Sequence, residues 1–378
     1  MNKIQISGNI PLQGSVTIQG CKNAALPLMA AAVLHEGVTV LHHCPRILDV
    51  EYMCRLLESM GCEVFWKNDS LTIDAAKIKD SRICEEEASC FRASVLLLGS
   101  LLGRFGSAAL PYPGGCSIGK RPIDFHLQAF ERLGASVMPE ESEICLQAKE
   151  LCGEEIVFTF PSVGATENAI LASVLARGTT VIRGCALEPE ITELCRFLNE
   201  KGADIRGIGG KTLTIRGVSR LFDSQYTLMP DRIVAGTYLL AVAGTCGKAT
   251  LKRASLTHLQ SLEEILVRNG AVLTESADGV RIDAGRMKRA REYVCTAPYP
   301  GFPTDLQSQL TAFFCGTESE AVVEERVFEA RFQTVRELQK MGAEIHMDGC
   351  AVYINGKRNR LHGASVCARD LRGGAALV

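Results

Sequence analysis

Apolar and polar positions follow a pattern that recurs about every seventy residues along the chain. In five places an amphipathic stretch ends in a glycine, which a small residue and a short alternating apolar run follow. These glycines are Gly61, Gly134, Gly202, Gly270 and Gly342, at intervals of 73, 68, 68 and 72 residues. Apolar residues three or four apart form one face of a helix, and glycine readily adopts the left-handed conformation that ends one. We therefore predict five helices, each capped by its glycine and followed by a strand.

Each predicted strand leads into a hairpin. Asp278-Gly279 and Asp348-Gly349 separate short alternating runs, as does Gly209-Gly210, and such dipeptides favour tight turns. A second helix, rich in Ala and Leu on all sides, precedes each capped helix, which is typical of a helix buried inside a domain. In the first repeat, Asp49 is the predicted N-cap of the capped helix.

The repeat therefore reads helix, strand, helix, hairpin. We predict an α/β fold in which such units cluster into globular domains, each with three sheets around buried helices. Five units are complete, and a sixth begins at Asp370-Leu371-Arg372. The chain stops at Val378, inside the first helix of this sixth unit. By the length of the repeat, we expect roughly forty to fifty residues of it to be missing and its core to be half built.

Composition narrows the possible classes of function. The 378 residues fit about two domains, and 47% hydrophobic with 22% charged residues is ordinary for a folded protein. A net charge of −2 gives no reason to expect binding to nucleic acid or to an anionic membrane. The longest apolar stretches, Ala24–Leu34 and Val95–Leu102, are too short for membrane insertion, and the first residues lack the apolar core of a secretion signal. We expect a cytoplasmic protein whose 16 cysteines are reduced and include no Cys-x-x-Cys metal site.

Charged residues stand where the buried helices begin. They are Lys22, Arg92, Asp231, Arg232, Asp305, Asp370 and Arg372. A helix N-terminus offers free N–H groups and a partial positive charge, so several that converge with Lys and Arg favour phosphate or carboxylate. The alternative is that each charge caps its own helix or forms a local ion pair. Repetition at the same place in successive units favours a shared anion site.

Two glycine-containing loops are further candidates. The run from Pro113 to Pro122 has three glycines in six residues and presents Cys116 near Lys120 and Arg121. Cationic neighbours lower the pKa of a thiol, so we interpret Cys116 as a reactive cysteine rather than a core residue. The turn at 161–166, PSVGAT, offers backbone N–H groups to a diphosphate or a nucleobase edge.

With these motifs together, the sequence resembles the UDP-N-acetylglucosamine 1-carboxyvinyltransferases, a family of enolpyruvyl transferases. The resemblance runs from about residue 5 to the last residue. It rests on GCKNAALP at 20–27, FRAS at 91–94, PGGCSIGKRPID at 113–124, PSVGATEN at 161–168, EPEI at 188–191, MPDRI at 229–233, APYPGFPTDLQSQ at 297–309, RVFEARF at 326–332 and ARDLRGGAALV at 368–378.

The resemblance implies a fold and a reaction. The family fold has two inside-out α/β domains with the active site in the cleft between them. On this chain the first domain maps to 1–21 with 230–378, and the second to 22–229. The implied substrates are phosphoenolpyruvate and UDP-N-acetylglucosamine. The products are the enolpyruvyl ether at the sugar 3-hydroxyl and phosphate, in the first committed step of peptidoglycan synthesis, with no metal or organic cofactor.

The resemblance also assigns residues. Cys116 matches a loop cysteine that donates a proton and can add covalently to the enolpyruvyl group, and Asp305 matches a base that contacts the sugar 3-hydroxyl. Asp370 aligns with a further active-site carboxylate, and Asn23 with a substrate contact. The anion clamp comprises Lys22, Arg92, Arg121, Arg331 and Arg372. The nucleotide-sugar contacts are Arg121, Pro122, Ile123, Asp124, Phe125, Phe160, Pro161, Ser162, Val163 and Val327.

Two alternatives remain open. One is an inactive paralogue that binds UDP-N-acetylglucosamine, since the absent C-terminal segment carries a further clamp arginine in the family. Loss of one such cation could lower the rate by roughly 10²–10³. The other is a shikimate-pathway enolpyruvyl transferase, which shares the fold but uses no loop thiol and binds no nucleotide. The motifs around Cys116 and at 161–166 disfavour it.

Overall fold

The computed structural model describes residues 3–8, 10–83, 92–112, 119, 122–139, 143–287, 291–317, 320–358 and 361–378. The chain divides into two compact units. Unit 1 holds the described residues up to Ile18, Gly119, and those from Pro230 onward, whereas unit 2 holds the other described residues from Gln19 to Met229. Each unit has its own hydrophobic core.

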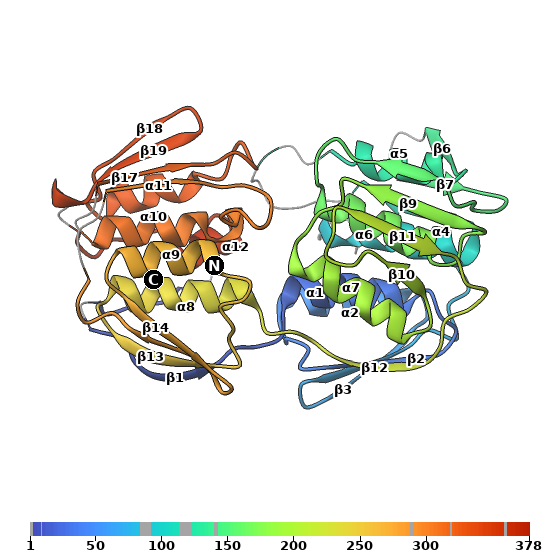
Figure 1. Ribbon diagram of the computed structural model, residues 1–378, viewed down its shortest axis with the longest axis horizontal. Helices are drawn as coiled ribbons and strands as arrows, with labels where there is room; N and C mark the ends of the chain where they lie inside the picture. The colour runs from blue at the N-terminus through green and yellow to red at the C-terminus, as the bar shows by residue number, and fades with distance from the viewer. Residues whose placement is uncertain are drawn as a thin grey trace. The chain divides into compact units, whose positions relative to one another are not determined.

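Unit 2 contains three sheets within its described residues (Figure 1). The first has the order β12 (Ser224–Thr227), β2 (Val38–His42), β4 (Ser70–Asp74), β3 (Glu63–Lys67). The second has the order β5 (Ser107–Pro111), β7 (Glu143–Gln147), β6 (Ser136–Pro139). The third has the order β10 (Asp204–Arg206), β11 (Thr212–Arg216), β9 (Thr179–Arg183), β8 (Glu155–Val157).

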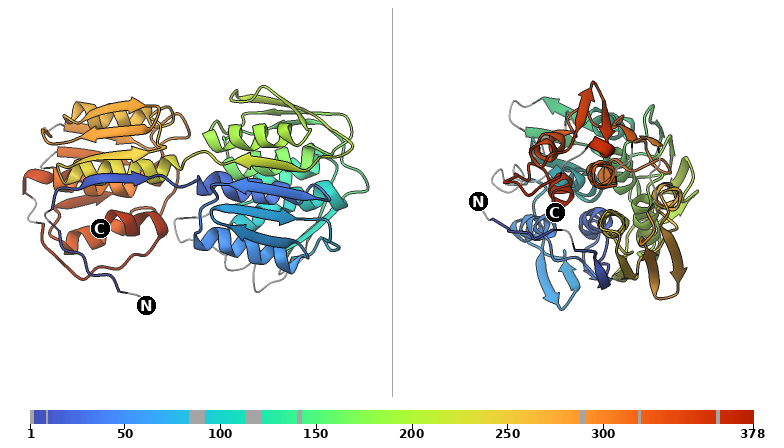
Figure 2. Two further views of the ribbon diagram at one scale, coloured as in Figure 1. Left: turned by 90° about the horizontal axis from the view of Figure 1, so that it is seen from below. Right: turned by 90° about the vertical axis from the view of Figure 1, so that its left-hand side faces the viewer.

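Unit 1 contains two sheets within its described residues. One has the order β1 (Gln13–Thr17), β13 (Lys248–Lys252), β15 (Gly279–Asp283), β14 (Val272–Ser276). The other has the order β16 (Arg291–Cys295), β17 (Glu320–Glu324), β19 (Ala351–Asn355), β18 (Ile345–Asp348). Strand β1 runs parallel to β13, beside which it lies in Figure 2. The prediction of three sheets per domain therefore holds for unit 2, while unit 1 shows two sheets and the start of a sixth repeat.

The predicted repeat is confirmed in all five sheets. In each, the first strand of a repeat pairs antiparallel with the third, and the third pairs antiparallel with the second, as a hairpin requires. The helix between the first and second strands is in turn α2 (Leu48–Ser59), α5 (Asp124–Arg132), α7 (Pro189–Glu200), α9 (Gln260–Arg268) and α11 (Gln333–Lys340). The five capping glycines have φ between +88° and +102°, which confirms the predicted left-handed ends.

In the five complete repeats, most residues of the helix that precedes each capped helix are buried, as predicted. Unit 2 holds α1 (Lys22–Ala32), α4 (Leu97–Phe105) behind the short helix η1 (Arg92–Leu96), and α6 (Val163–Ser173). Every residue from Ala165 to Ser173 is buried in α6. Unit 1 holds α8 (Arg232–Gly244), which packs on α10 (Gln307–Gly316) behind η2 (Thr304–Leu306), together with η3 (Gly356–Arg358) and α12 (Leu371–Ala376). Burial on most sides explains why α1, α4, α6, α8 and α10 lack a polar face, whereas Gly373 is the only buried residue of α12.

One predicted cap is wrong. Helix α2 begins at Leu48 with Ile47 as its N-cap residue, and Asp49 lies inside the first turn. A carboxylate there still suits the positive end of the helix. The Asp49 carboxylate forms an ion pair with the ammonium group of Lys22.

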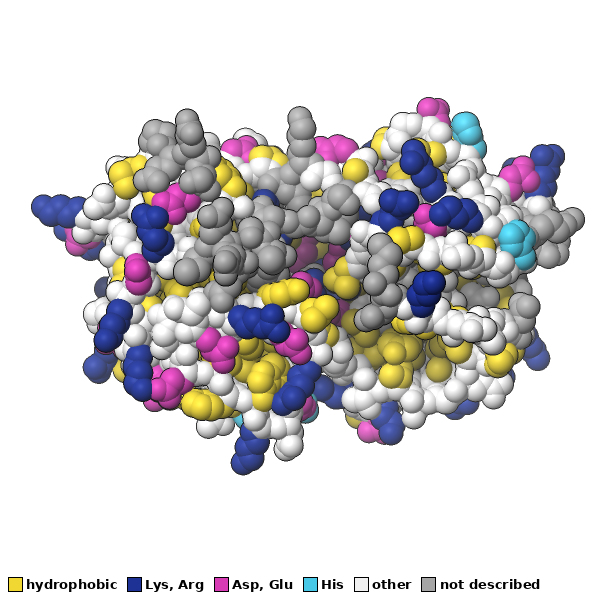
Figure 3. All heavy atoms as spheres, turned by 180° about the vertical axis from the view of Figure 1, so that it is seen from behind, with side chains coloured by type: hydrophobic (Ala, Val, Ile, Leu, Met, Phe, Trp, Pro, Cys, Tyr) yellow, Lys and Arg dark blue, Asp and Glu magenta, His cyan; other side chains and the backbone are white. Residues whose placement is uncertain are grey.

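Three further features of the structure concern membrane-spanning helices, groups of metal ligands and the distribution of surface charge. No helix in the described part of the chain has the length and apolar character needed to cross a bilayer. Within the same residues, no three His, Cys, Asp or Glu side chains are grouped so that they could hold a metal ion. On the face drawn in Figure 3, Lys and Arg side chains are interspersed with Asp and Glu, as a net charge of −2 leads one to expect.

Candidate active site

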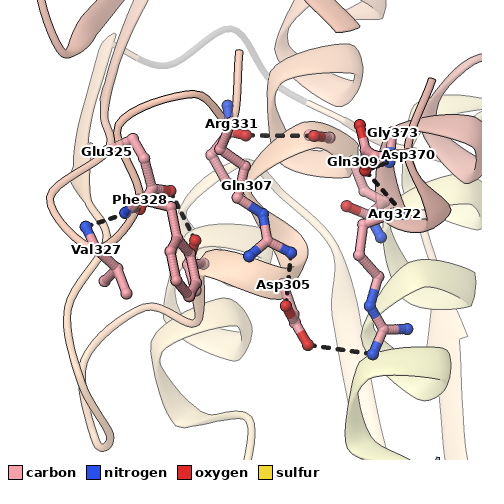
Figure 4. Close-up of polar contacts among 12 residues, drawn as sticks. Asp305, Gln307, Gln309, Glu325, Val327, Phe328, Arg331, Asp370, Arg372 and Gly373 are labelled. Carbon is pink, nitrogen blue, oxygen red and sulfur yellow. Dashed lines mark hydrogen bonds and ion pairs between the residues drawn. The ribbon is translucent and has the colours of Figure 1, made fainter. Parts of the chain in front are cut away.

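A charge cluster in unit 1 surrounds Asp305, which lies in η2 directly ahead of α10 (Figure 4). The Arg331 guanidinium donates from Nη2 to Asp305 Oδ1 at 2.6 Å, and the Arg372 guanidinium donates from Nη2 to Oδ2 at 3.1 Å. The side chains of Asp305, Arg331 and Arg372 are 24%, 4% and 14% exposed. The structure thus brings together three predicted site residues that lie far apart in the sequence.

The protonation state of Asp305 follows from these neighbours. Burial raises the pKa of its carboxyl group, but the positive charges of Arg372, Arg331 and Arg232 outweigh burial and hold the pKa well below its usual range. Arg232 is 8% exposed at the start of α8, with its guanidinium over the Tyr299 ring. Asp305 is therefore an ionised carboxylate at neutral pH.

Asp370 acts locally. Its Oδ1 accepts hydrogen bonds from the backbone N–H of Arg372 at 3.0 Å and of Gly373 at 2.7 Å, so it is the N-cap of α12. A Cβ at position 373 would meet both Thr334 Oγ1 and the Asp370 carboxylate, so glycine is required there. Asp231 caps α8 in the same way. For Asp370, the cap holds the backbone that carries Arg372.

A residue that the sequence analysis missed connects the predicted site segments. Glu325 is 3% exposed, and its Oε1 accepts from the backbone N–H of Val327 at 2.8 Å and of Phe328 at 3.0 Å. Its Oε2 accepts from the Thr304 hydroxyl at 2.8 Å. The Arg331 guanidinium lies over the Phe328 ring, 5.4 Å from the centroid. Glutamate at a strand end looks like an ordinary surface residue in a sequence, so only the fold reveals this role.

In unit 2, Lys22 is the first residue of α1 and is held by Asp49. Lys22 Nζ lies 2.5 Å from Asp49 Oδ2, with the two side chains 18% and 29% exposed. Asn23 follows on the same helix, and Arg92 opens η1; both are half-buried. The first turn of α1 has no side-chain cap at Cys21. The positive end of the helix and the ammonium group of Lys22 together favour an anion here.

The two predicted nucleotide-sugar segments of unit 2 lie side by side. The Phe125 ring at the start of α5 meets the Phe158 ring edge-on at 6.1 Å between centroids. Ser162 is the N-cap of α6, and its hydroxyl accepts from the Ala165 N–H at 3.4 Å. Residues that the structure leaves exposed or half-exposed in these segments are Pro122, Ile123, Asp124, Phe125, Phe160, Pro161, Ser162 and Val163.

Two buried side chains, also missed from the sequence, hold these segments together. Asn168 Oδ1 accepts from the backbone N–H of Gly99 at 2.8 Å, which fixes the orientation of its amide. Its Nδ2 then donates to His126 Nδ1 at 2.9 Å. The other side of the His126 ring packs against Gly164, where a Cβ would lie 3.0 Å from Cε1. These contacts hold the start of α5 against α6, close to the predicted nucleotide-sugar residues.

Cys116 and Arg121 lie outside the described residues. Their neighbour Gly119 is described, and it packs against the backbone and carboxylate of Glu329 in the 326–332 loop. Of the 13 described cysteines, eight are buried. Burial raises the pKa of the Cys195 thiol to about 12, so such thiols are unreactive at neutral pH, as predicted for core positions.

Comparison with known proteins adds a family and a fold. Residues 6–378 match the model of the family described as EPSP synthase (3-phosphoshikimate 1-carboxyvinyltransferase). The UDP-N-acetylglucosamine 1-carboxyvinyltransferase 2 of Caldanaerobacter subterraneus subsp. tengcongensis is 44% identical over 378 residues, which is 100% of this chain and 90% of that protein. The protein of the same name from Clostridium acetobutylicum is 41% identical over 379 residues, with the same coverage.

Solved structures share the fold at low identity. The enolpyruvyl transferase NikO from Streptomyces tendae superposes with a TM-score of 0.84 at 23% identity, covering 96% of this chain and 87% of NikO. The EPSP synthase of Acinetobacter baumannii superposes with a TM-score of 0.70 at 18% identity, covering 98% of this chain and 90% of that one. Similarity at this level shows a common fold and nothing about the substrate.

Proposed function

Because the chain belongs to the EPSP synthase family of carboxyvinyltransferases, we propose that it transfers the enolpyruvyl group of phosphoenolpyruvate to the 3-hydroxyl of UDP-N-acetylglucosamine and releases phosphate. The comparisons confirm the predicted enolpyruvyl transferase fold and the family that the motifs resemble. The relatives are named carboxyvinyltransferases, so the chain belongs to a family of transferases.

The choice of acceptor rests on one observation, the identity of 40–44% along the whole chain to relatives named for UDP-N-acetylglucosamine. The EPSP synthase structures match at only 18–19% identity. The shikimate-pathway alternative is therefore disfavoured.

Phosphoenolpyruvate is a small, highly charged anion and requires several cations. We assign this role to the clamp residues that the resemblance implies, which are Lys22, Arg92, Arg121, Arg331 and Arg372. The guanidinium groups of Arg331 and Arg372 present planar forks of N–H donors that suit carboxylate and phosphate. In the described structure Lys22 pairs with Asp49, and Arg331 and Arg372 pair with Asp305, so an anion bound by these three side chains would compete with a carboxylate for each.

Asp305 is proposed to accept the proton of the sugar 3-hydroxyl. A carboxylate bound by two guanidinium groups is a weak base, because both of its oxygens are occupied. Phosphoenolpyruvate would compete for Arg331 and Arg372 and so raise the pKa of Asp305 when the acceptor needs it. The base would then act only when both substrates are present.

The remaining steps involve the predicted loop thiol. Addition of the sugar oxygen to C2 needs a proton at C3, which we assign to Cys116, and elimination then removes a C3 proton and expels phosphate. Selective alkylation of Cys116 by a small electrophilic epoxide, dependent on the nucleotide sugar, would support this role. Asn23 and Val327, with the contacts around α5 and α6, are proposed to bind the nucleotide sugar.

The reaction would supply peptidoglycan synthesis, and through it cell-wall growth, cell shape and division. We propose that it takes place in the cytoplasm. In support, all 13 described cysteines are free thiols, as suits a reducing compartment.

The experiment that tests the proposed function is a comparison of acceptors. The purified chain is incubated with phosphoenolpyruvate and either UDP-N-acetylglucosamine or 3-phosphoshikimate, and phosphate release is followed. We expect release only with the nucleotide sugar. Release with 3-phosphoshikimate would favour the shikimate-pathway alternative. Calorimetric binding of UDP-N-acetylglucosamine without phosphate release would favour the inactive paralogue.

A further inference from the structure

We infer that Glu325 is a positioning residue that holds Asp305 and the Val327 backbone in register for the nucleotide sugar, an inference that rests on the proposed function. No substrate contact is assigned to the Glu325 carboxylate itself. Its carboxylate accepts hydrogen bonds from Thr304, Val327 and Phe328, and Figure 4 shows Glu325 beside Val327 and Phe328.

Glu325 is buried, with only 3% of the residue exposed, and a buried carboxyl group is stable only if its oxygens are hydrogen-bonded. Two backbone N–H groups supply them on Oε1, and the Thr304 hydroxyl supplies one on Oε2. Removal of any one donor leaves a buried acceptor less satisfied, so the carboxylate fixes the position of all three donors.

The three donors to Glu325 lie next to, or are themselves, proposed site residues. Thr304 directly precedes Asp305 in η2, so the hydroxyl bond holds the turn that orients the proposed base. Val327 is itself a predicted nucleotide-sugar contact. Phe328 lies under the Arg331 guanidinium, so the third bond supports one of the two cations on Asp305.

A second contact near Asp305 is expected to change when the substrates bind. The direct ion pair of Arg331 with Asp305 also joins the 326–332 loop to the 303–306 turn, but this pair is the one that phosphoenolpyruvate is proposed to loosen. The Glu325–Thr304 bond does not involve a substrate-binding group and persists when the ion pair is exchanged. It therefore keeps Asp305 aimed at the sugar hydroxyl at the moment when Arg331 turns to the anion.

The hydrogen bonds on the two carboxylate oxygens of Glu325 predict different kinetic effects. Thr304→Val removes the hydroxyl and keeps the shape, so we expect kcat to fall about tenfold because the base is misaligned, with KM for UDP-N-acetylglucosamine within about twofold. Thr304→Ser keeps the donor and should restore kcat to within about twofold of the wild-type value. Glu325→Ala also frees the Val327 backbone and should raise KM about tenfold, whereas Glu325→Gln keeps an acceptor oxygen and should do so far less.

The test is steady-state kinetics of these four variants and the wild type, with urea unfolding of each. A Thr304→Val enzyme with the kcat of Thr304→Ser, or a loss of kcat that only follows the unfolded fraction, would overturn the inference. If the wild type releases no phosphate, the proposed function itself fails. Calorimetry with UDP-N-acetylglucosamine then decides on its own: weaker binding by Glu325→Ala than by Glu325→Gln supports the positioning role, and equal binding overturns it.

Discussion

The charge cluster at Asp305 predicts a large and pH-dependent loss of stability for Asp305→Asn. The substitution keeps the shape of the side chain but removes the negative charge between Arg331 and Arg372, which are 4% and 14% exposed. The new amide oxygen can accept from one guanidinium, while its NH₂ group faces the other donor. Two charge-assisted hydrogen bonds of about 1.5–3 kcal/mol each are lost or weakened. Because both guanidinium groups lose the carboxylate between them, we expect a loss of about 3 kcal/mol at pH 7.

The pH dependence gives the sign of the effect. The pKa of Asp305 in the folded chain lies below the value of about 3.9 in an unfolded chain. A lowered pKa stabilises the folded state fully above the unfolded value and progressively less as the pH falls towards the folded value. The difference between wild type and Asp305→Asn should therefore be constant from pH 7 to pH 5. Below about pH 3.9 it should shrink by about 1.4 kcal/mol per pH unit.

The assay is urea unfolding of the wild type and Asp305→Asn at pH 7, 5 and 3.5. The matched control is Asp278→Asn, which changes an exposed carboxylate between β14 and β15 of the same unit. The control should differ from the wild type by less than about 0.5 kcal/mol. The reasoning is refuted if Asp305→Asn is as stable as the control at pH 7, or if its deficit grows as the pH falls.

Three further predictions concern single residues, each checked by urea unfolding. Asp370→Ala removes the α12 cap and should lower stability by about 1 kcal/mol and turnover with it, because the backbone of Arg372 is released; unchanged turnover would contradict this. Gly202→Ala places a Cβ at φ +101° and 2.7 Å from the Phe222 ring and should cost about 1–3 kcal/mol; a gain would contradict the left-handed cap. Burial lowers the pKa of Lys201 to about 8, below its value in the unfolded chain, so the buried side chain loses its charge as the pH rises above 8. The stability of the wild type should therefore increase by about 2 kcal/mol relative to Lys201→Met between pH 7 and pH 10, and a decrease would contradict this sign.

The regular part of the fold could be predicted from the sequence because it depends on local chemistry. Gly202 shows this: a glycine after an amphipathic helix predicts a left-handed end, and φ is +101° there. Asp49 shows the limit. Its position before apolar residues is typical of an N-cap, yet its carboxylate pairs with Lys22, which lies 27 positions earlier. No local pattern encodes a contact between two helix starts.

Some residues of the candidate site could be predicted from the sequence, and others could not. Motif resemblance selected Asp305, Arg331 and Arg372, and the fold brings their charged atoms into contact. Glu325 and His126 escaped notice, because a buried positioning residue carries no periodic signal and its partners are fixed by tertiary structure. Supporting residues of this kind are found only when the backbone around a site is known.

The central claim is that this chain moves the enolpyruvyl group onto UDP-N-acetylglucosamine. The most direct measurement is mass spectrometry of the nucleotide sugar after incubation with ¹³C-labelled phosphoenolpyruvate and the wild-type chain. We predict that the label enters the nucleotide sugar in equal amount to the phosphate released. Phosphate release that leaves the nucleotide sugar unlabelled would contradict the claim.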